Sequence, residues 1–254
     1  MILLLGGTSS TSPLALGLAR AGYRVLVSKA TDVPLEVGDH AGIETRWGPL
    51  DEEGLAALVA ARQIRAIVDA THPYATLIRA TAARVARAMA VPYLSLGRRP
   101  AVAADDSSVQ WVADHAAAAV AAFVPRRPVL LTTGARHLAP YVEQSRRTGV
   151  PLVARVLDHP DSLASCRRAG LSPAQVIAGR GPYSLEENLR QIRRFEIGVL
   201  VTKDGGPAGG TLEKLRAAEA AGCRVIVIAR PAQADAGSFT DVDALVAELV
   251  RLVG

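Results

Sequence analysis

Short apolar runs rich in β-branched residues alternate with helical stretches along the whole chain. Runs that are apolar at successive positions are typical of strands buried on both faces of a parallel sheet. In the first part, strands are expected at 1–5, 24–28, 66–70 and 92–96, and helices at 12–21, 51–63 and 75–90. This alternation predicts a doubly wound α/β domain.

The pattern is interrupted once and then starts again. The sequence GRRP at 97–100 and the polar, irregular stretch up to Val109 separate the two parts. Beyond them, strands are expected at 129–132, 152–157, 175–178, 199–202 and 224–228, and helices at 114–123, 184–195, 211–221 and 241–252. We therefore predict an α/β fold of two Rossmann-like doubly wound parallel-sheet domains, 1–97 and 98–254, with a cleft between them. The first domain would bind a dinucleotide, and the second would complete the cofactor and substrate cleft.

Composition agrees with an α/β enzyme of this kind. The 254 residues are 50% hydrophobic and 21% charged, which argues against disorder. The opening MILLLGGTSS has an apolar run of five residues and no basic segment before it, so it is expected to be a buried strand rather than a signal peptide. No apolar stretch is long enough to span a bilayer. Cys166 and Cys223 lack metal-site spacing and fit reduced thiols, so a cytoplasmic location is expected.

The formal charge of +5 comes mainly from arginines scattered along the chain. The chain has no block of five basic residues and no aromatic residues interleaved with basic ones, as a nucleic-acid-binding surface would need. A small anionic ligand therefore fits the charge better. The motifs G-x-S-x-G and H-E-x-x-H, the Walker lysine motif and Cys/His clusters are absent, which argues against hydrolases and metal sites.

The first candidate site follows the first strand, at Gly6, Gly7, Thr8 and Ser9. Glycines at a strand-to-helix turn let the backbone approach a phosphate, and the helix N-terminus adds N–H groups and a favourable dipole. The full G-x-G-x-x-G fingerprint is not present, and a tight turn with an N-cap is the alternative.

The second strand ends in Ser28 and Lys29. An NAD site would usually place an acidic residue here to bind the ribose hydroxyls. A hydroxyl followed by a cation suits a 2′-phosphate instead, so NADPH is expected rather than NADH. An ordinary solvated lysine is the alternative.

The strand at 66–70 leads into Thr71, His72, Pro73 and Tyr74. Polar loops after strands are where α/β proteins bind ligands. Thr71 can cap the next helix, with Pro73 in its first turn. That explanation does not account for His72. A histidine at this position can bind the cofactor or the substrate, or donate a proton.

Two loops of the second half have a similar character. Tyr183 lies in the sequence RGPYS at 180–184, before a helix that begins with acidic residues. Lys203, Gly205 and Gly206 lie in VTKDGG, after a very apolar strand. A lysine beside glycines can meet anionic groups with little obstruction, whereas a flexible turn is the alternative.

Taken in order, these segments resemble the precorrin-6A reductase family. The resemblance rests on ILLLGGT at 2–8, DATHPYA at 69–75, LTTG at 131–134, RGPY at 180–183, Glu187, VTKDGG at 201–206, Lys214 and Arg230-Pro231. The sequence departs from the family pattern in three places: Ser10-Thr11 replace an acidic residue and Ala, Gly205 replaces Ser, and Ala135 replaces a basic residue.

The resemblance implies an NADPH-dependent oxidoreductase of cobalamin biosynthesis that acts on a CH–CH bond. The implied reaction is hydride transfer to the tetrapyrrole precorrin-6A, giving precorrin-6B, without flavin or metal. The resemblance also implies that the cofactor and the macrocycle lie between the two domains. The implied cofactor-binding residues are Gly6, Gly7, Thr8, Ser9, Ser28, Lys29, Thr71, His72 and Tyr74. The implied substrate-binding residues are Tyr183, Lys203, Gly205 and Gly206, and the candidate proton donors are His72 and Lys203.

Three other functions remain open from the sequence. The cobalt complex of precorrin-6A, used by the anaerobic route, is an alternative substrate. A non-catalytic dinucleotide-sensing module would bind the cofactor and turn nothing over. A nucleic-acid-binding Rossmann domain would bind DNA with a steep salt dependence.

Overall fold

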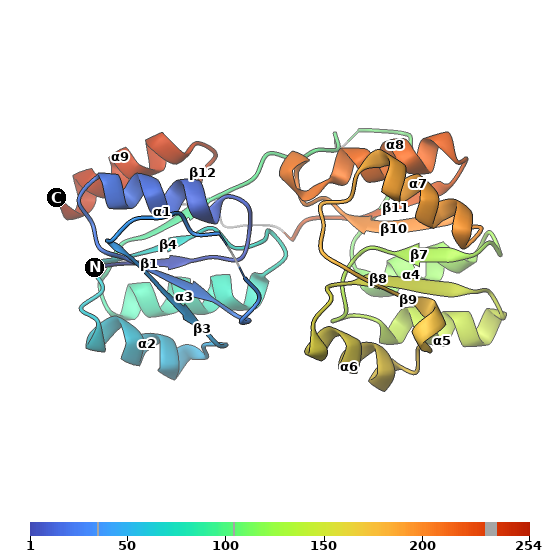
Figure 1. Ribbon diagram of the computed structural model, residues 1–254, viewed down its shortest axis with the longest axis horizontal. Coiled ribbons are helices and arrows are strands. Elements are labelled where there is room, and N and C mark those ends of the chain that lie inside the picture. Colours follow the sequence, from blue (N-terminus) through green and yellow to red (C-terminus); the bar gives the residue numbers. More distant parts are fainter. Residues whose placement is uncertain (35, 104, 232–237) are drawn as a thin grey trace. The chain divides into compact units, whose positions relative to one another are not determined.

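The computed structural model describes residues 1–34, 36–103, 105–231 and 238–254. The chain divides into two compact units, Met1–Arg98 with Pro231–Gly254, and Arg99–Arg230. Within the described residues, each unit has one six-stranded parallel sheet with helices on both faces (Figure 1). The predicted fold class, two Rossmann-like α/β domains, is confirmed.

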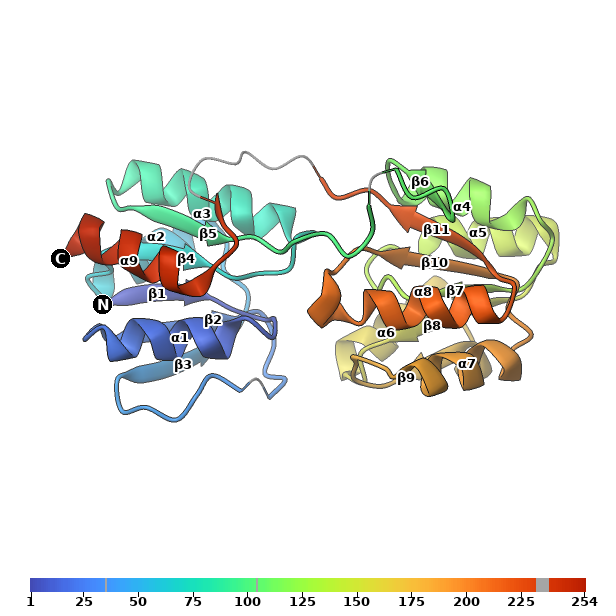
Figure 2. The same cartoon turned by 90° about the horizontal axis from the view of Figure 1, so that it is seen from above.

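In the first unit the strand order is β3-β2-β1-β4-β5-β12. Helices α1 and α9 pack on one face of this sheet, and α2 and α3 on the other (Figure 2). Its elements are β1 (Ile2–Leu5), α1 (Thr11–Arg20), β2 (Val25–Lys29), β3 (Ile43–Trp47), α2 (Glu52–Ala61), β4 (Ala66–Asp69), α3 (Thr76–Ala88), β5 (Tyr93–Leu96), β12 (Ser238–Phe239) and α9 (Val242–Val253).

The continuous apolar run of β1 follows from this layering. Successive side chains of a strand point to opposite faces of the sheet. Ile2 and Leu4 belong to the core under α1 and α9, whereas Leu3 and Leu5 belong to the core under α2 and α3. All four are buried, so every position of the strand is apolar.

In the second unit the order is β6-β11-β10-β7-β8-β9. Helices α7 and α8 cover one face, and α4, α5 and α6 the other (Figure 1). Its elements are β6 (Val109–Val112), α4 (His115–Phe123), β7 (Val129–Leu131), α5 (Ala139–Thr148), β8 (Leu152–Val156), α6 (Pro160–Ala169), β9 (Val176–Ala178), α7 (Leu185–Arg194), β10 (Val199–Lys203), α8 (Thr211–Ala220) and β11 (Arg224–Ile228), with short 3₁₀ turns at Pro173–Gln175 and Pro207–Gly209.

In each unit, one edge strand lies next to a crossing of the chain between the units. The chain crosses to the second unit after β5 and first forms β6, which pairs with β11. It crosses back after β11 and forms β12, which pairs with β5. Residues 231–254 therefore belong to the first unit, and the division differs from the expected one at residue 97, because two crossings join the units rather than one.

Besides the two-residue β12, four elements were not expected from the pattern: β3, β6, α5 and α6. Strand β6 begins where the irregular stretch was expected to end. The other three are half-exposed elements with many polar residues, so the apolar period that reveals a buried element is weak in them.

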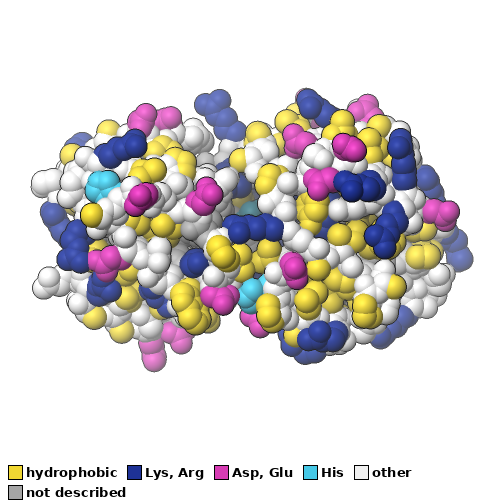
Figure 3. Space-filling model, in the orientation of Figure 1, with side chains coloured by type: hydrophobic (Ala, Val, Ile, Leu, Met, Phe, Trp, Pro, Cys, Tyr) yellow, Lys and Arg dark blue, Asp and Glu magenta, His cyan; other side chains and the backbone are white. Residues whose placement is uncertain are grey.

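Basic side chains are distributed over much of the face drawn in Figure 3, with acidic and apolar ones among them. This agrees with the scattering of arginine along the sequence. In the described part of the chain, no helix is both long and apolar enough to cross a membrane.

Candidate functional site

The predicted loops lie where doubly wound sheets bind ligands. In each unit the strand order reverses at one place, between β1 and β4 in the first and between β7 and β10 in the second. Ligands of such sheets bind at the carboxyl ends of the strands, at this reversal. The loops after β1 and β4 hold Gly6–Ser9 and Thr71–Tyr74, and the loop after β10 holds Asp204–Gly206.

The loop after β1 is built around Thr11. The Thr11 hydroxyl accepts hydrogen bonds from the amides of Gly7 (3.2 Å) and Thr8 (3.3 Å). A Cβ atom at Gly6 would lie 2.8 Å from Thr11 Cγ2 and 3.2 Å from Val27 Cγ1, so only glycine fits there. Gly7 has φ 128°, and a Cβ atom on it would meet nothing within 4 Å. The loop is therefore packed on its inner side and open at Gly7, as a phosphate-binding turn requires.

The loops after β1 and β4 are bonded to each other. The Thr8 hydroxyl donates to the carbonyl of Ala70 at 2.8 Å, and the Ala70 amide donates to the carbonyl of Leu5 at 2.9 Å. The first unit thus brings the predicted phosphate loop and the predicted His72 loop together at one edge.

Asp69 fixes the shape of the loop after β4. Its carboxylate is fully buried and accepts from the Thr71 amide (2.8 Å), Arg79 Nε (2.9 Å) and Tyr93 Oη (2.7 Å). Burial raises the pKa of Tyr93, and the Asp69 carboxylate raises it further, so the phenol remains a donor. These bonds tie the end of β4 to α3 and β5, which accounts for the first residue of DATHPYA.

Thr71 is not the cap of α3, because the helix begins at Thr76 with Ala75 as its N-cap. The capping interpretation of Thr71 is therefore wrong: Thr71 precedes a turn closed by the bond from the Ala75 amide to the His72 carbonyl, 2.8 Å. Among the described residues, the buried Thr71 hydroxyl has no hydrogen-bond partner. A buried hydroxyl without a partner costs free energy, so Thr71 points to a ligand that supplies one.

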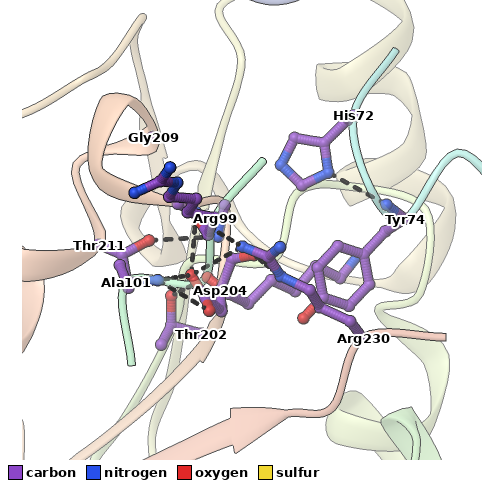
Figure 4. A network of polar contacts seen from close by, with 12 residues as sticks. His72, Tyr74, Arg99, Ala101, Thr202, Asp204, Gly209, Thr211 and Arg230 are labelled. Atoms are coloured by element: carbon purple, nitrogen blue, oxygen red, sulfur yellow. Dashed lines mark hydrogen bonds and ion pairs between the residues drawn. The ribbon is translucent and has the colours of Figure 1, made fainter. Parts of the chain in front are cut away.

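His72 and Tyr74 lie side by side in the same loop (Figure 4). The Tyr74 amide donates to His72 Nδ1 at 3.4 Å, and the ring centroids are 5.5 Å apart. Because Nδ1 accepts this bond, a neutral His72 carries its proton on Nε2.

Ser28 and Lys29, at the end of β2, have different surroundings. The Ser28 hydroxyl is buried and accepts from Arg46 Nη1 at 2.7 Å. Arg46 comes from the neighbouring β3 and also donates to the carbonyl of Gly48 at 3.1 Å. The Lys29 ammonium donates to the carbonyl of Val33 at 2.8 Å. The cation held beside Ser28 is therefore Arg46, whereas the Lys29 ammonium bonds to the loop after its own strand.

In the second unit, Asp204 organises the loop after β10 (Figure 4). Its carboxylate is almost fully buried and accepts from the amides of Gly206 (2.9 Å) and Ala101 (3.1 Å). The amide of Gly205 donates to the Thr211 hydroxyl at 3.2 Å, in the same way that the amide of Gly7 donates to Thr11. Burial lowers the pKa of Lys203, which ends β10, and Arg136 lowers it further.

Tyr183 stacks on a buried arginine. The Arg155 guanidinium carbon lies 4.2 Å from the centroid of the Tyr183 ring, and Arg155 Nη1 donates to Asn188 and Gln191, each at 2.8 Å. Burial lowers the pKa of Arg155 to about 10. The buried Tyr183 hydroxyl has no hydrogen-bond partner among the residues described. The stacking positions this loop at the carboxyl end of β8.

Two further residues of the family pattern also have structural surroundings. Glu187 forms a capping box with Ser184 at the start of α7, where each accepts the other's amide at 3.1 and 2.9 Å. Lys214, in α8, donates to the Gly209 carbonyl at 3.4 Å. Burial, with a smaller contribution from Arg155, lowers the pKa of Lys214 to about 8.

Arg46 and Arg155 were not found from the sequence. Arg155 lies within the otherwise apolar Leu152–Val156, and a charge in a buried strand is a signal of paired or functional residues. Arg46 lies on the unexpected β3, where the alternation of polar and apolar residues gave no such signal.

The chain matches a family model described as precorrin-6x reductase CbiJ/CobK over residues 1–250. A cobalt-precorrin-6A reductase of Priestia megaterium is 32% identical over 232 residues, which are 91% of this chain and 91% of the relative. A precorrin-6A reductase of Mycobacterium tuberculosis is 35% identical over 238 residues, which are 91% of this chain and 88% of the relative. A solved structure described as CobK precorrin-6A reductase superposes with a TM-score of 0.78 at 27% identity, and the match covers 99% of this chain and 96% of that chain.

Proposed function

The chain belongs to the precorrin-6x reductase (CbiJ/CobK) family, and from that premise we propose that it reduces precorrin-6A to precorrin-6B with NADPH. The family places the chain among the oxidoreductases of cobalamin biosynthesis. Three points go beyond family membership and are proposed: NADPH as the reductant, the metal-free substrate, and precorrin-6B as the product. The observation that carries it is the pair of bonded loops at the β1/β4 reversal, one with an open glycine and the other with an unpartnered buried hydroxyl.

A dinucleotide fits the residues at this edge. Gly6 is packed too closely for any side chain, and Gly7 leaves open space where a phosphate can approach the backbone. Among the described residues, the amides of Ser9 and Ser10 donate to no acceptor, and they stand at the N-terminus of α1. Gly6, Gly7, Thr8 and Ser9 are therefore proposed to hold the pyrophosphate. The Thr71 hydroxyl is proposed to bond to the cofactor, with His72 and Tyr74 beside it.

The choice of NADPH rests on the end of β2. Ser28 and Lys29 are proposed to bind the 2′-phosphate, and Arg46 is added because its guanidinium is bonded to the Ser28 hydroxyl. Arginine suits phosphate because its planar fork donates several hydrogen bonds at once. No acidic residue stands at this end of β2 to bind the ribose hydroxyls of NADH.

The protein's part in the chemistry is to align the reactants and to supply a proton. NADPH, when bound, supplies the hydride. The chain must hold donor and acceptor carbons in reacting geometry and keep water out. His72 Nε2 and Lys203 Nζ are the proposed proton donors, the first because its tautomer leaves a proton on Nε2. Tyr183, Lys203, Gly205 and Gly206 are proposed to bind the macrocycle, whose acetate and propionate groups need cationic partners. The cleft expected between the two domains stays a prediction.

The test is anaerobic NADPH oxidation by the purified protein, with precorrin-6A and its cobalt complex supplied separately. Turnover of the metal-free substrate with formation of precorrin-6B supports the proposal. NADPH binding without turnover of either substrate overturns it and leaves a dinucleotide-binding module. If His72→Ala and Lys203→Ala both keep full turnover at saturating NADPH, neither residue is the proton donor.

The cobalt complex is the second candidate substrate, because relatives over the same span of the chain include cobalt-precorrin-6A reductases. Turnover of the cobalt complex alone would favour this candidate over the first.

A further inference from the structure

Two histidines far apart in the sequence stack at the carboxyl edge of the second sheet. His115 begins α4, and His137 lies in the loop between β7 and α5. Their ring centroids are 4.3 Å apart, and the ring planes differ by 20°. His115 Nδ1 also lies 2.9 Å from the hydroxyl of the buried Tyr141.

The bond with Tyr141 fixes the tautomer of His115. Burial raises the pKa of Tyr141, and Asp114 raises it further, so the phenol keeps its proton at neutral pH. Within the described part of the chain, His115 Nδ1 is the one hydrogen-bond partner of this hydroxyl. A buried O–H needs an acceptor, so it donates to Nδ1, and a neutral His115 carries its own proton on Nε2.

Cations surround the pair. Burial, with smaller contributions from Lys203 and His137, lowers the pKa of His115 to about 4. The pKa of His137 is also lowered, mainly by burial and to a smaller extent by the charges of Lys203 and Arg136. Asp114 is the acid that favours a charged His115, and its carboxylate caps the first turn of α4. Both rings are therefore neutral near pH 7, at an edge where Lys203 and Arg136 repel further positive charge.

This arrangement is suited to an anion. A carboxylate that approaches Lys203 and the two rings offsets the repulsion and favours the charged imidazole. If the bound carboxylate raises the proton affinity of the imidazole, then by linkage protonation of the imidazole raises the affinity for the carboxylate by the same factor.

We propose that Lys203, His137 and His115 bind a carboxylate of the substrate, and that the histidine pair takes up one proton from solvent as this carboxylate binds. The inference rests on the proposed function, in which the substrate is a tetrapyrrole with several carboxylates. The step is a proton transfer without redox change: an N–H bond forms on a neutral imidazole, an O–H bond of hydronium breaks, and the resulting imidazolium pairs with the carboxylate. A purely structural stack would remain neutral whether or not the ligand is bound.

The experiment measures proton uptake during binding of uroporphyrin I, a metal-free tetrapyrrole polycarboxylate. Isothermal titration calorimetry in two buffers of different ionisation enthalpy gives the protons taken up per molecule bound. The wild type is expected to take up about one proton near pH 7. The His115→Gln/His137→Gln double variant should take up fewer protons and bind about tenfold more weakly near pH 6, because the imidazolium is lost.

The control is His40→Gln, since His40 lies in the first unit, where its Nδ1 accepts the amide of Gly42. This variant should keep the proton uptake and affinity of the wild type. NMR titration of the histidine ring protons, with and without uroporphyrin, tests the same point in the wild-type protein: a ring of the pair should titrate at higher pH when the ligand is bound.

Equal proton uptake by the wild type and the double variant would overturn the proposal, as would unchanged histidine titration. A wild type that fails to bind uroporphyrin would also overturn it. The proposed function is judged separately, by NADPH oxidation with precorrin-6A, and it stands if that reaction proceeds.

Discussion

Arg230 Nη2 lies 3.2 Å from Asp204 Oδ1, and this ion pair anchors both chain crossings to one loop of the second unit (Figure 4). Arg230 is the last residue of that unit, and Arg99 is the first. Arg230 also donates to the carbonyls of Asp204 (3.0 Å) and Arg99 (3.3 Å), while Asp204 accepts the amide of Ala101. The loop after β10 is thus held by the two segments at which the chain enters and leaves the unit.

Removing the arginine should destabilise the second unit. Arg230→Met leaves the buried Asp204 carboxylate without its cation, which costs about 3 kcal/mol. Urea unfolding followed by Trp111 fluorescence, in a Trp47→Phe background, reports on this unit because the chain has two tryptophans. Arg147→Met is the control within the same unit, since Arg147 is exposed and its guanidinium donates to Gln144 on the surface of α5, a contact that contributes about 0.5 kcal/mol. Equal effects of the two variants would contradict the importance of the Asp204 pair.

The apolar strands allowed much of this fold to be predicted. Ile2–Leu5 and Val199–Lys203 are buried almost throughout, so their composition alone indicates central strands. Ile43–Trp47 lies at a sheet edge with exposed positions, and its mixed sequence resembles a loop. The pairing of β12 with β5 of the first unit could not be predicted, because a strand's own residues do not specify which sheet it joins.

A matched pair of glycines tests the phosphate loop. Gly7 (φ 128°) and Gly22 (φ 90°) both have backbones that disfavour a side chain, and a Cβ atom would meet nothing within 4 Å on either. Ala at each position should cost about 1 kcal/mol of stability. Only Gly7→Ala should also weaken NADPH binding, measured by nucleotide fluorescence, because Gly22 follows α1 at its other end. Equal NADPH affinity in both variants would show that the loop does not approach the phosphates.

The surroundings of the site loops follow less directly from sequence. Thr71, His72 and Lys203 were found because they are polar residues directly at the ends of apolar strands, where the chain connects to a helix. Arg155 and His115 could not be connected with them, because their partners Tyr183 and His137 come from distant segments. Contacts of this kind depend on strand order, which local pattern does not contain.

Arg46 should determine the preference for the phosphorylated cofactor. Arg46→Gln removes the cation bonded to Ser28 and should weaken binding of 2′,5′-ADP about tenfold, with little effect on ADP. Calorimetric binding of the two nucleotides needs no tetrapyrrole substrate. Arg24→Gln is the matched control, because Arg24 precedes β2 at the opposite edge of the sheet and pairs with Glu44. If Arg46→Gln weakens both nucleotides equally, Arg46 does not recognise the 2′-phosphate.

Lys214 should make stability depend on pH in the alkaline range. Burial, with a smaller contribution from Arg155, lowers its pKa to about 8, whereas the unfolded chain keeps a value near 10.5. Between these values the unfolded state binds more protons, so the contribution of Lys214 to stability rises with pH and is least favourable below about pH 8. Lys214→Met removes this dependence. The variant should gain stability relative to the wild type at neutral pH, and the difference should shrink as pH approaches 10.5. Urea midpoints at several pH values measure it, with Arg216→Met, an exposed cation on the same helix, as the control. Parallel stability curves for wild type and Lys214→Met would contradict a depressed pKa at this position.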